Sequence, residues 1–373
     1  MRLRVALFPY LPDAQYDHFK SLNDSLVARF ERAHPEVQLI LRPKDSANFY
    51  DPGQLNRWLT SDSGYDIVEA DAEILGDLVA AKAIRPWPSG KDTMDWHPAA
   101  RRAVRIDGVQ YGIPHWLCAF ILFSRDRGIT RAQTAAELVH NLDGLANGPR
   151  PRLAGDLNGK WQLSSIYLDS WLETYGPSQF DKAVAPPLDS TVVQQVVQLA
   201  RECRVGTSNP CLTTWHDTDL AQFAFGRGET AALVDYSEAL WRVITLDTAA
   251  RHSMSLEVAP LGAGRRPALF VDVFVRRSEC SGPCEQAAES FVRFMDTPET
   301  QSFIIMSEDG RRGVPRYLLP ATLSAYETPS VRGDAFYRTL SSEIRDGYSF
   351  PNAGLSATGD TIKQLLVKAI NGT

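Results

Sequence analysis

Cys118 is the side chain of this 373-residue chain with the most chemical scope. It lies in the apolar run from Trp116 to Leu122. A thiolate is a strong nucleophile, but at an ordinary cysteine pKa of about 8.5 only a few per cent is ionised at neutral pH, so a base or a positive field must assist. The alternative is that Cys118 is a small buried apolar residue, which is the usual role of cysteine in such a run.

Glu238 is a candidate base with an equally simple alternative. The segment Asp235-Tyr236-Ser237-Glu238 begins a helical pattern and resembles a capping box, in which the glutamate only accepts a backbone N–H. As a base, a glutamate of ordinary pKa is about 4 units more acidic than a thiol, so complete proton transfer before attack would cost roughly 6 kcal/mol. Proton removal during attack, or burial that raises the glutamate pKa, lowers this cost.

Two aspartates occupy positions in predicted strands that favour a role in binding. Asp71 directly follows the apolar strand from Ile67 to Ala70, at a carboxyl end where ligands of α/β sheets bind. Asp272 lies inside an apolar strand over residues 268–275, where an unpaired carboxylate would cost several kcal/mol and therefore needs a partner. The alternative for both is an aspartate bonded only to the backbone.

Short apolar runs alternate with helical patterns along the chain. Residues 4–8, 37–41 and 66–70 are predicted strands, and apolar residues at three- and four-residue spacing predict a helix over 16–30. This order predicts an α/β protein of mostly parallel sheets flanked by helices. Asp107-Gly108 predicts a turn, and residues 262–267 predict a loop.

Composition narrows the classes of function. The formal charge of −6 and the absence of a basic stripe argue against nucleic acid as a partner. No apolar run reaches the roughly 18 residues of a membrane span. The seven histidines are scattered without metal-ligand spacing, so no metal and no cofactor is predicted. The length suggests two domains in what we expect to be a monomer.

The cysteines bear on the compartment. Cys203 and Cys211, and Cys280 and Cys284, are each close enough in sequence to form a small disulfide loop in an oxidising compartment, which leaves Cys118 as the odd one. The alternative is five reduced thiols in the cytoplasm. The disulfide interpretation favours a secreted or periplasmic protein whose leader is not part of the chain, because no signal-type apolar segment begins the sequence.

The segment Asp107 to Pro114, followed by a strand that ends in Ser124-Arg125-Asp126, resembles the hinge region of bacterial solute-binding proteins with the type II periplasmic-binding fold. Residues 288–301 resemble a helix pair of the same superfamily. The resemblance implies two discontinuous lobes with a ligand cleft between them: residues 1–113 with 257–312, and 114–256 with 313–373.

A closer resemblance lies within that superfamily. Four segments occur in the order and at the separations typical of thiaminase I (thiamine pyridinylase): Val5 to Asp13, Tyr111 to Cys118, Tyr236 to Glu238, and Tyr317 to Ala321. In that family a cysteine attacks the pyrimidine of thiamine at the carbon that bears the methylene bridge, the thiazolium leaves, and a second nucleophile replaces it. The resemblance implies that Cys118 is the nucleophile and Glu238 the base, with Asp71 and Asp272 holding the aminopyrimidine.

Aromatic side chains complete the expected binding site, because ring faces hold a flat cationic heterocycle by stacking and cation–π contact. The candidates are Tyr10, Tyr50, Trp116 and Tyr236, each of which has core packing as its alternative.

The chain departs from the family pattern where Phe8, Phe270 and Asp219 stand in place of tyrosines. These departures predict an altered substrate or acceptor preference, with Asp219 adding charge to the site.

The expected partners are thus thiamine or a related aminopyrimidine, and an amine, pyridine or thiol acceptor. A second hypothesis is a solute-binding protein without catalytic activity that carries thiamine, another cationic heterocycle or a sugar. In that case Cys118 is a packing residue and Glu238 a helix cap.

Overall fold

A computed structural model describes residues 1–7, 11–43, 49, 51–61, 63–88, 95–145, 148, 150–159, 161–216, 218–310 and 313–372. Contacts divide the chain into two compact units, which are described separately. The first comprises Met1–Cys118, Phe270–Arg338 and Ser349–Ser356. The second comprises Ala119–Leu269, Thr339–Tyr348 and Ala357–Thr373.

The first unit is built on a mixed sheet in the order β12-β6-β11-β3-β1-β2, with β13 paired to β11. β1 pairs in parallel with β2 and β3, whereas β11 is antiparallel to β3 and β6. The strands are β1 (Arg2–Leu7), β2 (Gln38–Pro43), β3 (Ile67–Asp71), β6 (Gly112–Cys118), β11 (Ala268–Arg276), β12 (Leu319–Pro320), β13 (Tyr348–Ser349) and the hairpin β4 (Arg105–Ile106) with β5 (Val109–Gln110).

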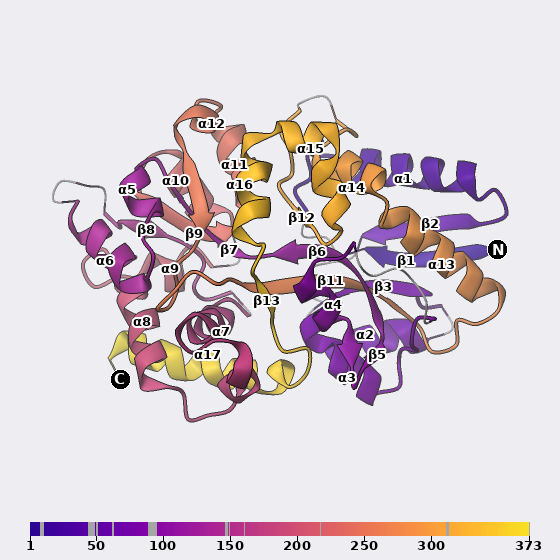
Figure 1. Ribbon diagram of the computed structural model, residues 1–373, viewed down its shortest axis with the longest axis horizontal. Helices are drawn as coiled ribbons and strands as arrows, with labels where there is room; N and C mark the ends of the chain where they lie inside the picture. The colour runs from indigo at the N-terminus through magenta and orange to yellow at the C-terminus, as the bar shows by residue number, and fades with distance from the viewer. Residues whose placement is uncertain are drawn as a thin grey trace. The chain divides into compact units, whose positions relative to one another are not determined.

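Helices flank this sheet, and α1 lies beside α13 (Figure 1). Phe30 of α1 contacts Phe291 and Phe294 of α13 with ring centroids 5.9 and 5.6 Å apart. The helices are α1 (Lys20–Ala33), α2 (Pro52–Thr60), η2 (Ala72–Ile74), α3 (Leu75–Ala80), α4 (Pro98–Ala103), α13 (Pro283–Met295), α14 (Pro298–Ile305), η4 (Leu323–Glu327) and α15 (Pro329–Gly333).

The second unit has a four-stranded sheet in the order β10-β7-β9-β8. Its strands are β7 (Phe120–Ser124), β8 (Leu153–Ala154), β9 (Ala232–Tyr236) and β10 (Ser255–Val258). Its helices are α5 (Arg127–Thr130), α6 (Ala135–Asp143), α7 (Gln162–Tyr175), η3 (Pro177–Val184), α8 (Ser190–Arg201), α9 (Pro210–Thr213), α10 (Leu220–Gly226), α11 (Ala239–Leu246) and α12 (Ala250–Ser253), with most of α16 (Ala335–Glu343) and α17 (Leu355–Asn371).

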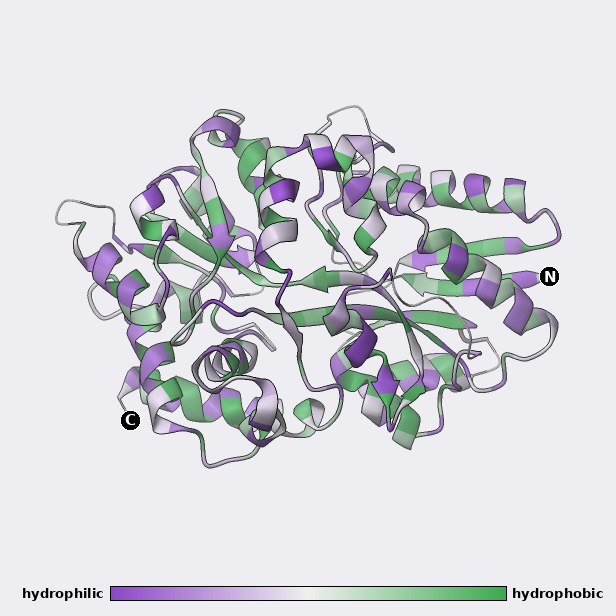
Figure 2. Ribbon diagram, in the orientation of Figure 1, coloured by the Kyte–Doolittle hydropathy of each residue, from purple (hydrophilic) through white to green (hydrophobic). Residues whose placement is uncertain are grey.

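Sequence periodicity accounts for these elements. Leu22, Leu26 and Phe30 lie on one side of α1 and are buried. Apolar residues follow the strands of both sheets (Figure 2). Asp107 and Gly108 both have positive φ, at 50° and 78°, and form the predicted turn between β4 and β5.

The α/β architecture with flanking helices was predicted correctly, but both sheets are mixed rather than mostly parallel. Long segments of chain separate β11 and β9 from the preceding strands of their sheets. Connections of this length allow either strand direction, so these strands can run antiparallel to a neighbour. The apolar run around Cys118 is also two strands rather than one, because β6 ends at Cys118 and β7 begins at Phe120.

The unit boundaries differ from the predicted lobe boundaries at four places, one of which is that Ser349–Ser356 belongs to the first unit. β6 pairs with β11 as far as Cys118, so the first unit continues five residues beyond 113. β10 pairs with β7, which places residues 257–269 in the second unit. β12 pairs with β6, which places residues 313–338 in the first.

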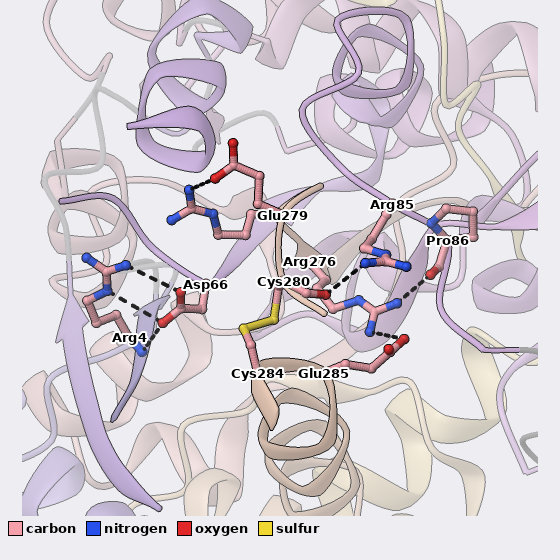
Figure 3. The surroundings of a disulfide bond; sticks show 10 residues. Arg4, Asp66, Arg85, Pro86, Arg276, Glu279, Cys280, Cys284 and Glu285 are labelled. Atoms are coloured by element: carbon pink, nitrogen blue, oxygen red, sulfur yellow. Dashed lines mark hydrogen bonds and ion pairs between the residues drawn. A yellow bond between two sulfur atoms is a disulfide. The ribbon is translucent and has the colours of Figure 1, made fainter. Parts of the chain in front are cut away.

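Two disulfides join four of the five cysteines, Cys203 to Cys211 and Cys280 to Cys284. The second lies at the start of α13 among several charged pairs (Figure 3). There Arg85 Nη1 donates to the Cys280 carbonyl oxygen at 3.2 Å, and Arg276 Nη1 lies 2.6 Å from Glu285 Oε1. Cys118 forms no disulfide, as the disulfide interpretation of the sequence predicts.

No helix among the described residues is both long and apolar enough to cross a bilayer.

Candidate functional site

A row of three predicted site residues crosses the sheet of the first unit. In the strand register Asp71 of β3 lies opposite Asp272 of β11, which lies opposite Trp116 of β6. Residues directly opposite one another project from the same face of a sheet. The three side chains are buried, with exposed fractions of 5, 6 and 2%. The structure therefore brings together two carboxyl groups and an indole that the sequence places in three distant segments.

Cys118 projects from the same face as this row. It lies opposite Phe270, two residues before Asp272 on β11, and alternate residues of a strand share a face. As the last residue of β6 it is partly exposed, whereas the rest of the strand is buried. It is therefore not the fully buried packing residue of the alternative interpretation.

Glu73 adds a third carboxyl group that the sequence analysis missed. Its backbone N–H donates to Asp71 Oδ1 at 3.0 Å in the turn that starts η2, and its side chain is 3% exposed. Glu73 Oε1 has no hydrogen-bond partner among the described residues. The signal in the sequence was a second acidic residue two positions after Asp71, at the carboxyl end of a predicted strand.

Two of these carboxyl groups, those of Asp71 and Glu73, hold their protons more strongly than usual. Burial raises the pKa of Asp71 to about 7. Burial also raises the pKa of Glu73 well above its ordinary value, and the nearby charges of Asp71 and Asp272 raise it further. Trp116 contributes an N–H donor, because its buried Nε1 has no partner among the described residues. The site thus offers a ligand the buried carboxyl groups of Asp71 and Glu73, which hold a proton readily, and the indole N–H of Trp116.

Burial of these carboxyl groups predicts a pH dependence of stability. Because the folded-state pKa of Glu73 lies above its unfolded value, the free energy of unfolding falls as pH rises from about 4.5. We expect Glu73→Gln to raise the melting temperature by at least about 2 °C at pH 8 and to leave it nearly unchanged at pH 4.5, by calorimetry of the ligand-free protein.

Glu285→Gln is the matched control for that measurement, with the opposite sign. Its ion pair with Arg276 lowers the pKa of Glu285, so the pair stabilises the folded state above the unfolded pKa and the variant should melt earlier at pH 8. A Glu73→Gln variant that is less stable than the parent at pH 8 would contradict the assignment.

Glu238 lies in the second unit, between the end of β9 and the start of α11. Its Oε2 is buried and has no hydrogen-bond partner among the described residues. Burial raises its pKa to about 8, and the nearby Asp235 carboxylate adds to the effect.

The capping-box interpretation of Glu238 is wrong. Glu238 itself is the N-cap residue of α11, and its side chain makes no capping hydrogen bond. The helix begins only at Ala239 because β9 extends to Tyr236, so Asp235 is a strand residue and not a cap. Asp235 instead accepts from Gln222 Nε2 at 3.0 Å, and burial raises its pKa to about 6.

The remaining predicted residues fall into two groups. Tyr236 stacks on Phe120 with ring centroids 5.1 Å apart, and its hydroxyl donates to Gln162 Oε1 at 2.6 Å. Asp219 forms an ion pair with Arg242, which compensates the charge that the sequence analysis expected it to add to the site. Tyr10 and Tyr50, like Phe8, lie outside the described residues.

No group of His, Cys, Asp and Glu side chains in the described part of the chain is arranged to hold a metal ion.

Thiaminase-1 of Paenibacillus thiaminolyticus is 25% identical to this chain over an alignment of 342 residues, and the match covers 87% of the chain and 77% of the relative. The resemblance to thiaminase I is confirmed. The structure of Clostridium botulinum thiaminase I in complex with thiamin has a TM-score of 0.78, with 19% identity and 99% of each chain covered. No family model matches the chain.

The fold is also shared with sugar-binding proteins. Maltose-bound MalE3 of T. maritima has a TM-score of 0.74, with 14% identity, and covers 99% of this chain and 94% of its own. The predicted fold class, that of type II periplasmic-binding proteins, is therefore confirmed.

Proposed function

We propose that this protein is a thiaminase I-like transferase that acts on thiamine or a related aminopyrimidine, with Cys118 as its nucleophile. The observation that carries the proposal is the placement of Cys118 on the same sheet face as Asp71, Asp272 and Trp116. The similarity to thiaminase I over most of the chain supports the choice of substrate.

In the proposed reaction the Cys118 thiolate adds to the ring carbon next to the one that bears the methylene bridge. A ring double bond breaks in this step, and the amino group and the bridge-bearing carbon are left as an enamine that can expel a leaving group from the methylene carbon. The bond between the bridging methylene carbon and the thiazolium nitrogen then breaks, and its electron pair leaves with the thiazole, which becomes neutral. An amine, pyridine or thiol acceptor next forms a bond to the methylene carbon and releases Cys118 as thiolate. Glu238 takes the proton of the thiol and passes it to water, and the ionised carboxylate later takes the proton of an acceptor that carries one.

Asp71 and Asp272 are suited to a protonated aminopyrimidine. Their buried carboxyl groups gain from a ligand that supplies N–H donors and positive charge, because burial makes an ionised carboxylate costly unless it is paired. Protonation of the pyrimidine makes its ring carbon more electrophilic and offsets the negative charge that attack introduces. We propose that Trp116 and Tyr236 contact the rings of the substrate, and that Tyr10, Tyr50 and Asp219 contribute to binding.

The experiment is a thiamine-consumption assay with pyridine or aniline as acceptor, followed by chromatography of the exchanged product. Purified protein should consume thiamine and release the thiazole in equal amounts. No consumption above that of a Cys118→Ser variant would reject the enzyme.

The shared fold with maltose-bound MalE3 favours a second function, that of a solute-binding protein without catalytic activity. Under that function, stoichiometric protein binds thiamine or another small ligand and returns it unchanged after long incubation. Recovery of the intact ligand by mass spectrometry therefore separates the two functions.

A further inference from the structure

Strand β6 contains one residue more than its partner β11 can pair. Pro114 lies opposite Val273, and Trp116 lies opposite Asp272, so His115 between them has no opposite residue on β11. This is a β-bulge, in which two residues of one strand face one of the other. Proline is tolerated at such positions because the ladder there needs no N–H. On its other side β6 is paired normally, and the Ala321 N–H donates to the His115 carbonyl oxygen at 3.0 Å.

The extra residue determines which face of the sheet carries Cys118. With a regular ladder His115 would lie opposite Asp272 and Trp116 opposite Val271. A shift of one residue moves every following side chain to the other face. Trp116 and Cys118 would then project away from Asp71 and Asp272.

The side chain of His115 is anchored from two directions. Its ring lies between those of Trp116 and Phe274, with centroids 3.9 and 4.7 Å away. Its Nδ1 is 2.5 Å from Glu69 Oε1 on β3, two strands away. His115 is 2% exposed and Glu69 is 1% exposed. Among the described residues His115 Nε2 has no hydrogen-bond partner, so the contact with Glu69 is the one that fixes the imidazole.

We propose that Glu69 and His115 are positioning residues that hold β6 in its bulged register and thereby place Cys118 and Trp116 on the face of Asp71 and Asp272. Neither residue takes part in the chemistry. A buried polar pair is a poor source of stability but an effective way of fixing a register, because a different register breaks the hydrogen bond between the two side chains. The catalytic consequence rests on the proposed function, whereas the placement of Cys118 does not.

The test measures the rate at which iodoacetamide alkylates Cys118 in the native protein, followed by intact mass and peptide mapping. Glu69→Gln keeps an acceptor oxygen for His115 and should alkylate within twofold of the parent rate. Glu69→Met has a similar volume and removes the acceptor, and it should slow alkylation at least tenfold. Glu285→Gln breaks an ion pair to β11 without touching the bulge and should leave the rate unchanged.

A second variant protects the test against misfolding. Glu69→Met/His115→Val leaves no buried polar atom at the pair and puts a residue suited to a regular strand into the bulge, so it should also slow alkylation tenfold or more. Parental rates in the folded Glu69→Met or double variant would overturn the proposal, and so would equal losses in Glu69→Gln and Glu69→Met. A parent protein that fails to consume thiamine would reject the proposed function but leave this measurement intact.

Discussion

Replacing Cys118 by serine is expected to lower the kcat for thiamine consumption at least ~10³-fold, which corresponds to about 4 kcal/mol of transition-state stabilisation. The sulfur must be ionised to attack, and a serine hydroxyl is far less acidic and less nucleophilic than a thiol. The change is small in volume and affects a partly exposed strand end. If Asp71, Asp272 and Trp116 hold the substrate as proposed, the dissociation constant for thiamine should therefore change less than twofold.

Isothermal titration gives the affinity of the variant, and the chromatographic assay gives its rate. Intact mass of the parent protein after rapid acid quenching should show a pyrimidine adduct on Cys118 that is absent from the serine variant. The two disulfides serve as an internal check, because the parent and the serine variant should both keep four cysteines oxidised. A serine variant with parental turnover would remove Cys118 from the reaction.

The sequence identified Asp71 and Asp272 as site residues from their positions in predicted strands, but it could not show which residues lie opposite one another in the sheet. Asp71 and Asp272 were predicted from the strands that carry them, yet their opposition to Trp116 depends on a register that is set across distant segments. Periodicity alone cannot show the extra residue in β6, because a bulge breaks the alternation on which the counting depends. His115 and Glu69 were therefore missed, although Glu69 lies in a predicted strand and His115 directly precedes a predicted apolar run.

The electrostatics of the site were predicted less well than its residues. The sequence analysis kept a capping role as the alternative for Glu238 because its spacing from Asp235 fits a capping box, but tertiary pairing extends β9 through that segment. Asp219 was expected to add charge, yet Arg242, 23 residues further on, is placed beside it by the packing of α10 against α11. Both errors arose because a local pattern was read without the partners that the fold brings to it.

The raised pKa of Glu238 changes the energetics of the proposed proton transfer. With an ordinary glutamate, transfer from a thiol of pKa about 8.5 before attack would cost roughly 6 kcal/mol. With the pKa of Glu238 at about 8, the two groups differ by about half a unit and the same transfer costs less than about 1 kcal/mol. Burial of Glu238 thus makes it a base matched to a thiol, although only about a tenth of the protein carries it ionised at pH 7.

Glu238→Gln is expected to lower kcat by about 10²- to 10⁴-fold, because the variant can accept no proton. In the parent, kcat/KM should rise with pH and level off above an apparent pKa near 8, because the base acts only when ionised. This rising limb of the pH–rate profile reports the ionisation of Glu238. In the variant this limb should disappear, and the remaining activity should follow the ionisation of the thiol alone. Rates between pH 5 and pH 10 test both statements.

Unfolding does not account for the expected loss. The folded-state pKa of Glu238 lies above its unfolded value, so its burial makes the parent less stable as pH rises from about 4.5 to about 8, and glutamine removes that decline. The variant should therefore melt no earlier than the parent at pH 8, where its activity is compared. Glu229→Gln, an exposed residue paired with Arg227 in the same unit, is the matched control and should keep parental activity. A glutamine variant that keeps the limb near pH 8 would show that another group is the base, with Asp235 the next candidate because burial raises its pKa to about 6.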